Sequence, residues 1–358
     1  MKDLNEFLSA LLEKGAVDAV MAPQRSAPSD VGFPAMVSKP EKLKADPFAP
    51  VLPVSTARAA SVLTREGKLP GPVAVVMRNC QLRALIELQK LNQADLENMI
   101  IIGVDCPGTF SLKEFREIAG EKSSSELYSS LLAGDEELTG KIRTSCQTCI
   151  APVPENCDII IGTLGAGDGS FELIGVTDKG KEILKSAGYE SVKISDKRKK
   201  AVENLTEDRR AADEKFRAEH NSIKGIDKIL EFFSTCINCH NCRSVCPICY
   251  CRECFFDSDA LDQSAESLVS KSKSRGAFKM PLDTLLFHTG RFNHMILSCV
   301  ECGLCEQACP SEIPLMQVTK RVAADAREKF GYMPGLDPEE DVPLKVFKED
   351  EFTEAGEK

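Results

Sequence analysis

Hydrophobic positions in the N-terminal half of the chain alternate between helical spacing and short continuous runs. One helical face opens the chain, with apolar residues at Leu4, Phe7, Leu8 and Leu11. Short apolar runs typical of buried strands follow at 17–21, 73–77, 99–104 and 159–161. Helical patterns stand between them at 56–63, 82–88 and 111–118. Strands that alternate with helices predict an α/β domain with a parallel sheet.

Two N-terminal segments depart from this alternation. Residues 22–54 are rich in proline and small residues, and we expect them to form a long surface excursion over the sheet or, alternatively, a cofactor loop. Residues 171–177 follow a glycine-rich loop and are predicted to pair with 159–161 as a hairpin.

The C-terminal half shows helical patterns only, around 226–233, 260–270, 282–287 and 318–330. Residues 191–221 are dense in both charge signs and predict a solvated helix between domains; the alternative is a basic lip for an anionic cofactor or for docking. The acidic tail is expected to be extended. The predicted division is an α/β domain at 1–190, a charged helical linker at 191–225, an all-α ferredoxin-like domain at 226–332 and an acidic tail at 333–358.

Composition narrows the class of protein. Hydrophobic residues at 42% and charged residues at 28% are ordinary for a globular protein, and no apolar run is long enough to cross a bilayer. The net charge of −10 argues against nucleic acid as the main partner. Sixteen cysteines without a recognisable leader predict reduced, metal-bound thiols in a cytoplasmic protein. No Ser/His/Asp set or carboxylate pair indicates hydrolysis.

Two cysteine runs near the C-terminus carry the strongest chemical signal. Each reads C-x2-C-x2-C-x3-C-P, the spacing that places three thiolates on one iron–sulfur cube and the fourth on another. The runs are Cys236, Cys239, Cys242, Cys246 and Cys299, Cys302, Cys305, Cys309. Crossed ligation predicts one [4Fe–4S] cluster on the first three cysteines of the first run plus Cys309, and a second on Cys299, Cys302, Cys305 and Cys246.

Zinc and disulfides are the alternatives for these runs. Structural zinc usually uses two separated cysteine or histidine pairs, without a third C-x2 step. Disulfides require an oxidising compartment, which the sequence does not indicate. Three further cysteines, Cys249, Cys251 and Cys254, exceed the needs of two cubes. They are interpreted as buried small side chains, with a zinc site or a redox pair as alternatives. His240 and His294 lie near the runs and either tune the clusters by hydrogen bonding or are ordinary histidines.

Two more cysteines stand where predicted strands end. Cys80 follows the strand at 73–77, and Cys106 follows the strand at 99–104. Carboxyl ends of parallel strands meet at one edge of a sheet, so both thiols are expected at the edge where such sheets build their sites. The start of a helix at Cys80 also favours a thiolate there.

Anion-binding features are also present. Ser55 is a natural N-cap for a helix that starts at Thr56, and such a start offers free N–H groups. The loop between the hairpin strands is glycine-rich, with Gly162, Thr163, Gly165, Gly167 and Asp168. Its backbone would allow close approach of a phosphate. Because it lies between two strands rather than before a helix, an ordinary hairpin turn is the alternative.

The N-terminal part resembles the β subunits of deazaflavin-reducing hydrogenases and cytoplasmic formate dehydrogenases. The matching stretches are LLEKGAVD at 11–18, VVMRNCQ at 75–81, IIGVDC at 101–106, and the Cys146-x2-Cys149 pair with CDIIIG at 157–162. The C-terminal part is similar to the helical ferredoxin of formate dehydrogenase β chains and of heterodisulfide reductase C-type subunits. That likeness rests on residues 291–292 and 298–306.

The resemblance implies FAD in the α/β domain and a third [4Fe–4S] cluster held by Cys80, Cys106, Cys146 and Cys149. The chain departs from the family at Arg78-Asn79, where the family usually has Thr-Pro; the side chain of Asn79 is still able to donate to a flavin carbonyl. The expected function is that of an electron-transfer subunit that moves electrons between an FAD-linked hydride carrier, deazaflavin or nicotinamide, and a chain of clusters. The catalytic metal centre is then expected on a partner dehydrogenase or hydrogenase subunit.

Two other functions remain open at this point. One is a flavin-less iron–sulfur adaptor that joins a dehydrogenase to heterodisulfide-reductase-like subunits. The other is an interaction scaffold stabilised by zinc. The flavin content of the purified protein distinguishes the adaptor from the main prediction. Its metal content distinguishes the zinc scaffold from the main prediction.

Overall fold

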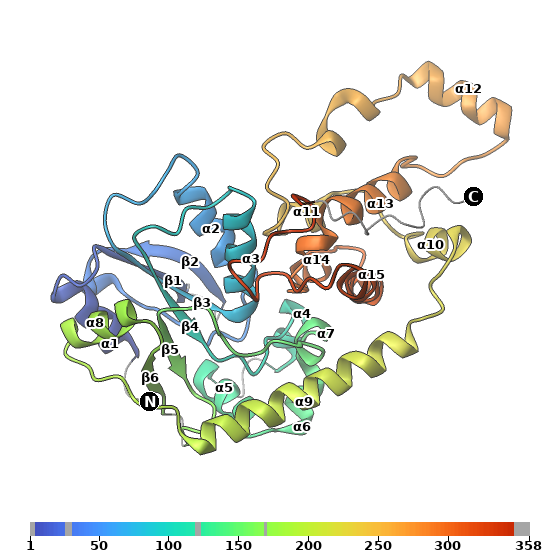
Figure 1. Cartoon of the computed structure of the whole chain (residues 1–358). Helices are drawn as coiled ribbons and strands as arrows, with labels where there is room; N and C mark the ends of the chain where they lie inside the picture. Colours follow the sequence, from blue (N-terminus) through green and yellow to red (C-terminus); the bar gives the residue numbers. More distant parts are fainter. Residues whose placement is uncertain (1–3, 26–30, 119–122, 168–169, 347–358) are drawn as a thin grey trace.

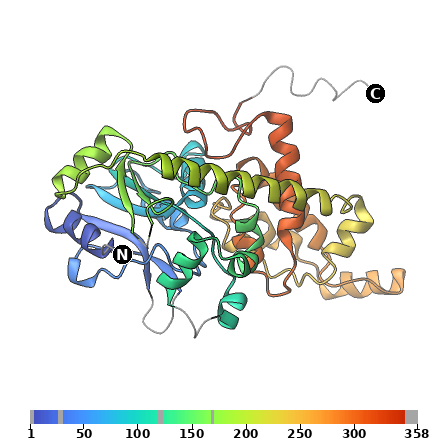
Figure 2. The same cartoon turned by 90° about the horizontal axis from the view of Figure 1, so that it is seen from below.

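The computed structural model describes residues 4–25, 31–118, 123–167 and 170–346. An α/β domain and a helical domain lie side by side, and one long helix runs along both (Figure 1 and Figure 2). This arrangement agrees with the predicted order of an α/β part followed by a helical part. Within the described ranges, no helix combines the length and the apolar character needed to cross a membrane.

A six-stranded sheet forms the centre of the α/β domain, in the order β2-β1-β3-β4-β5-β6. Its strands are β1 (Ala19–Arg25), β2 (Gly32–Val37), β3 (Val73–Arg78), β4 (Met99–Val104), β5 (Ile159–Gly162) and β6 (Glu172–Gly175). The four inner strands are parallel, and β2 and β6 pair antiparallel at the two edges. The predicted hairpin of residues 159–161 with 171–177 is therefore confirmed as β5 and β6.

Helices cover both faces of the sheet because its inner strands are apolar on both sides. Successive side chains of a strand point to opposite faces. On β3, Val76 packs in one core with Leu8, whereas Val75 and Met77 pack in another core with Leu85. The first core belongs to α1 (Leu4–Glu13) and α8 (Asp178–Ser186), and the second to α2 (Thr56–Leu63) and α3 (Asn79–Lys90). Four short helices follow β4: α4 (Leu112–Ile118), α5 (Ser124–Leu132), α6 (Glu136–Lys141) and α7 (Thr144–Gln147).

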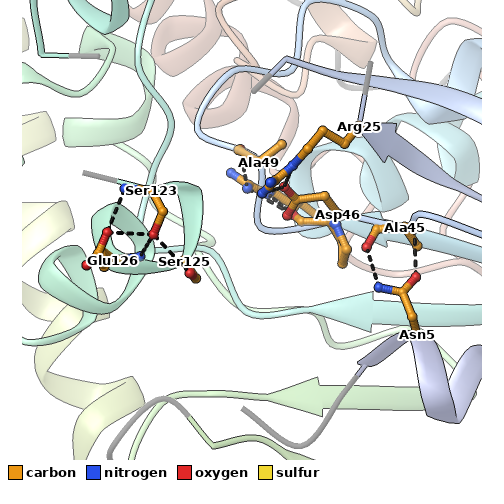
Figure 3. A network of polar contacts seen from close by, with 10 residues as sticks. Asn5, Arg25, Ala45, Asp46, Ala49, Ser123, Ser125 and Glu126 are labelled. Carbon is orange, nitrogen blue, oxygen red and sulfur yellow. Dashed lines mark hydrogen bonds and ion pairs between the residues drawn. The ribbon is translucent and has the colours of Figure 1, made fainter. Parts of the chain in front are cut away.

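Residues 22–54 differ from the predicted surface excursion. β1 continues to Arg25 and pairs with β2, so the start of this segment is an edge of the sheet. The following loop is tied down by polar contacts (Figure 3). Arg25 forms an ion pair with Asp46 at 2.9 Å, and the Asn5 side chain exchanges two hydrogen bonds with the backbone of Ala45. Proline and small residues suggested a loop because the strand periodicity of this edge hairpin is weak.

The second domain contains only helices among its described residues. They are α10 (Ile226–Phe232), α11 (Asn241–Ser244), α12 (Ala265–Arg275), α13 (Thr284–Met295), α14 (Leu304–Gln307) and α15 (Leu315–Phe330). α12 has no buried residue and projects from the body of the domain (Figure 1). The core that starts at β3 and α3 continues without interruption into the cysteine-bearing segments of this domain. The two domains therefore share one apolar core.

The predicted charged linker is α9 (Asp196–Glu219), and it does more than connect the domains. Arg198, Arg209 and Asp213 are buried on its inner side. Arg198 forms an ion pair with Asp105 of the α/β domain, with one pair of atoms at 2.8 Å. Asp213 forms an ion pair at 3.0 Å with Lys320 of α15. α9 is thus a brace between the domains.

Lys320 is the centre of this brace, and only 1% of its surface is exposed. Besides Asp213, its ammonium group pairs with Glu301 at 2.7 Å and donates to the carbonyl of Thr148. Burial lowers the pKa of Lys320, and Asp213 opposes that effect. The contacts join α15, α9, the segment between Cys299 and Cys302, and the end of α7.

The acidic tail also differs from its prediction as an extended segment. Its described part, up to residue 346, packs on α3. Tyr332 donates to Glu87, the Gly335 N–H donates to the same carboxylate at 2.8 Å, and Arg83 donates to the Pro334 carbonyl at 2.8 Å. Val342 is fully buried. The composition of the tail could not predict these contacts, because their partners lie on α3, which is distant in the sequence.

We predict that Lys320→Met lowers the free energy of unfolding by about 3–5 kcal/mol, because it removes the buried cation that Asp213 and Glu301 share and leaves each of them with one arginine partner at the edge of the network. Lys113→Met is the matched control: Lys113 also joins the two domains, through Glu312, but its side chain is 65% exposed, so we expect a loss below about 1 kcal/mol. The midpoint of chemical unfolding, followed by circular dichroism, checks both. Equal losses would show that the buried network does not stabilise the interface.

Candidate functional site

Four thiols of the α/β domain line one cavity. Cys80 lies in the first turn of α3, Cys106 follows β4, and Cys146 and Cys149 lie in and after α7. The strand ends and the short helix bring these separated segments together at one edge of the sheet, as predicted for the first two. The cavity is also lined by Cys302 of the helical domain. This thiol set is therefore adjacent to the second cysteine run.

Buried cations and donors surround this thiol set. Arg143 lies 3.6 Å from the Cys146 sulfur, and the Thr109 hydroxyl lies 3.5 Å from it. Burial raises the pKa of the Cys146 thiol, but Arg143 and Thr109 outweigh that effect and bring the pKa to about 7. Arg78 lies 3.5 Å from the Cys106 sulfur. Its guanidinium also donates to three backbone carbonyls, at Pro47, Ala49 and Gly108. A negatively charged group in this cavity would meet fixed positive charge.

The two C-terminal cysteine runs interleave in space. Cys309, the last cysteine of the second run, is a close electrostatic neighbour of Cys236 and Cys242. Cys246, the last cysteine of the first run, is the corresponding neighbour of Cys299, Cys302 and Cys305. α11 and α14, which carry the middle of each run, are in contact. This is the neighbourhood that crossed ligation requires.

Burial makes several of these thiols poor thiolates on their own. It raises the pKa of Cys299 to about 12 and the pKa of Cys242 to about 11. Iron binds the thiolate and so compensates that burial cost. Among the described residues, no group of three or more His, Cys, Asp or Glu side chains is arranged around a single metal ion. A cube spreads its four thiolates over four irons, so the donors stand further apart than around one ion. The thiol sets present fit that group.

One histidine that the sequence did not single out lies beside the first run. The ring of His288 stacks on Phe233, with centroids 3.7 Å apart, and its Nε2 lies 3.3 Å from the Cys236 sulfur. Burial, and then the neighbouring Arg291, lower the pKa of His288 to about 3. Of the two histidines considered from sequence, His240 pairs with Asp257 at 2.6 Å, and His294 lies at the edge of Phe256. His288 carried no local signal because its partner is far away in the sequence.

The predicted cofactor-binding residues separate into two places. Ser55 and Asn79 line the cavity of the four thiols, and Asn79 donates to the Ala151 carbonyl at 3.0 Å. The hydroxyls of Ser55 and Thr56 are buried, without a hydrogen-bond partner in the described part of the chain. These two hydroxyls are free to accept or donate to a ligand.

The glycine loop lies elsewhere, and the described residues 162–167 do not line that cavity. The N–H groups of Thr163 and Leu164 donate to the Asp105 carboxylate, at 2.8 and 3.0 Å. A side chain at Gly165 would meet the backbone of Arg198. These contacts give Gly162, Thr163 and Gly165 a role in packing α9 against the sheet, whereas a side chain at Gly167 would meet nothing within 4 Å. Asp168 lies outside the described residues.

The three surplus cysteines are not equivalent. Cys249 is partly buried, and its thiol lies within hydrogen-bonding reach of Cys246. Cys251 is exposed, and Cys254 is partly buried. The interpretation of all three as buried small side chains is wrong for Cys251.

The α/β domain has four convergent thiols, and a common core joins it to two interleaved cysteine runs. Together these features define an iron–sulfur electron-transfer protein. Residues 71–201 match the family model for the C terminus of the coenzyme F420 hydrogenase/dehydrogenase beta subunit, and residues 232–313 match a 4Fe-4S dicluster domain. These two matches support the resemblance to this family of β subunits that was noted from sequence.

Two relatives align with nearly the whole chain. It is 29% identical to the F420-dependent formate dehydrogenase subunit beta of Methanocaldococcus jannaschii, over 91% of this chain and 89% of that one. It is 28% identical to the F420-dependent formate dehydrogenase 1 subunit beta of Methanococcus maripaludis, over 92% and 89%. Among solved structures, a chain of the F420-reducing [NiFe] hydrogenase complex of Methanosarcina barkeri aligns with 18% identity and a TM-score of 0.46, over 62% of this chain and 86% of that one.

We predict that His288→Phe makes the reduction potential of the nearest cluster more negative. The phenyl ring keeps the stacking on Phe233, but it removes a donor to the Cys236 sulfur, and such donors stabilise the more negative reduced cluster. A redox titration followed by electron paramagnetic resonance measures the shift. His294→Phe, at an exposed position of the same helix, should leave the potential unchanged. A shift of similar size in both variants would contradict the hydrogen bond.

Proposed function

We propose that this chain is the β subunit of an F420-dependent formate dehydrogenase, which exchanges a hydride, and thus one electron pair, with the deazaflavin and single electrons with a partner. The two relatives that align over nine-tenths of the chain support the formate and deazaflavin part. The formate-oxidising metal centre is assigned to a partner subunit. Heterodisulfide-reductase-like subunits are proposed as a further electron partner because of the helical ferredoxin domain.

The proposal includes three [4Fe–4S] clusters in a row. Cys80, Cys106, Cys146 and Cys149 hold the first, Cys299, Cys302, Cys305 and Cys246 the second, and Cys236, Cys239, Cys242 and Cys309 the third. One observation carries this order: Cys302 lines the cavity of the first set, while Cys242 lies near Cys305. The second set therefore lies between the other two. The chain's own residues hold the clusters, exclude water and neutralise charge.

FAD is proposed beside the first thiol set. When bound, the flavin divides the electron pair of a hydride into single electrons, and the clusters carry these one at a time. Ser55, Thr56 and Asn79 are the proposed contacts, because two buried hydroxyls lack partners and Ser55 and Asn79 line the cavity. The glycine loop is a weaker candidate, since its N–H groups at Thr163 and Leu164 already donate to Asp105.

The iron content tests the number of clusters. Anaerobically purified chain should hold about twelve irons, and Cys149→Ala should hold about eight. Cys157→Ala is the matched control, because Cys157 is buried against Gly103 and Pro154, outside all three sets. It should keep the full content. If the wild-type chain holds about eight irons and Cys149→Ala does not change that value, only the two C-terminal clusters exist.

Cofactor extraction and anaerobic mixing test the flavin. The purified chain should release FAD, and reduced F420 should bleach the flavin and then the clusters. Ser55→Val should lower the FAD content because it removes a hydroxyl that faces the cavity, and Ser186→Val, on the surface helix α8, should not. A chain with full iron but without flavin would favour the alternative function of an iron–sulfur adaptor.

A further inference from the structure

Arg291 is a buried cation without an oxygen partner. It lies on α13, only 3% of its surface is exposed, and none of its three guanidinium nitrogens donates to an oxygen within the described part of the chain; its polar contacts are with the thiols of Cys305 and Cys249. Other buried cations differ: Arg83 donates to the Pro334 carbonyl, Arg198 pairs with Asp105, and Lys320 pairs with Asp213. An unpaired buried charge is costly, so a compensating anion is expected at Arg291.

The neighbours of Arg291 are thiols of both cysteine sets. The side chains that interact most strongly with its positive charge are, in decreasing order, Cys305, Cys246, Cys242 and Cys249. Cys242 belongs to the set completed by Cys309, whereas Cys246 and Cys305 belong to the set with Cys299. The guanidinium therefore faces both sets from one position. No carboxylate interacts with its charge as strongly as these thiols do. Once iron is bound, each set becomes anionic, and its negative charge increases when the cluster takes up an electron.

We infer that Arg291 is the common counter-charge of the two clusters in the helical domain and raises the reduction potential of both. The inference rests on the proposed ligand sets. In a low-dielectric interior a nearby cation favours the more negative, reduced state of each cluster. This role of Arg291 also explains a feature of the fold. The segment between the two runs, 247–298, folds back through α13, which places Arg291 against both sets of thiols.

The test is a redox titration of the full chain, purified without oxygen and followed by electron paramagnetic resonance, together with iron and sulfide content. Arg291→Gln and Arg291→Met remove the charge, and Arg291→Lys keeps it without the planar fork. We expect both clusters of the neutral variants to have more negative potentials than those of the wild type. Arg291→Lys should lie between. Arg275→Met, on the exposed α12, removes a charge of the same domain and should change nothing.

Each result decides the role of Arg291. Neutral variants with full iron and wild-type potentials would overturn the inference. If the neutral variants lose iron, the lysine variant decides: retained iron in Arg291→Lys supports a counter-charge, and equal loss shows a structural role only. The proposed function fails separately, if the wild-type chain gives no two-cluster signal after reduction.

Discussion

Neutralisation of negative charge inside an apolar core is the constraint on which this structure depends. In the proposed three-cluster chain, twelve thiols in three neighbouring sets would become anionic on binding iron, and most of them are buried or partly buried in the core that the two domains share. The chain places cations among them: Arg143 near Cys146, Arg83 near the Cys80 and Cys299 sets, and Arg291 between the two C-terminal sets. Because the dielectric constant there is low, each cation has a strong effect on the stability of the reduced clusters.

Most of these cations are held in place by a second contact. Arg78 donates to three carbonyls of distant loops, and Arg143 donates to Gln307 at 3.0 Å. Fixed donors do not need to reorganise when an electron arrives, which favours rapid transfer between sites. Arg78 is also part of the wall of the first thiol cavity.

The junction of the two domains holds two of the proposed cluster sites in place relative to each other. Lys320 joins α15 and α9 to Glu301, which lies between Cys299 and Cys302, and to Thr148, which precedes Cys149. The same ion-pair network therefore sets the separation of the first two thiol sets. A change in domain orientation would alter that separation directly. The buried network and the shared core make such a change costly.

The sequence alone determined the elements and most of the candidate ligands. Hydrophobic periodicity located β3, β4, the β5–β6 hairpin and α2, since local spacing decides these features, and the repeated cysteine spacing identified both C-terminal runs. Tertiary structure decided the rest. The β1–β2 edge, the packing of the tail on α3 and the charged contacts of α9 depend on partners far away in the sequence. The same holds for His288 and Arg291, which are ordinary residues of a helix until the fold places them against cysteines of the first run, more than forty positions away. No local pattern records such a contact.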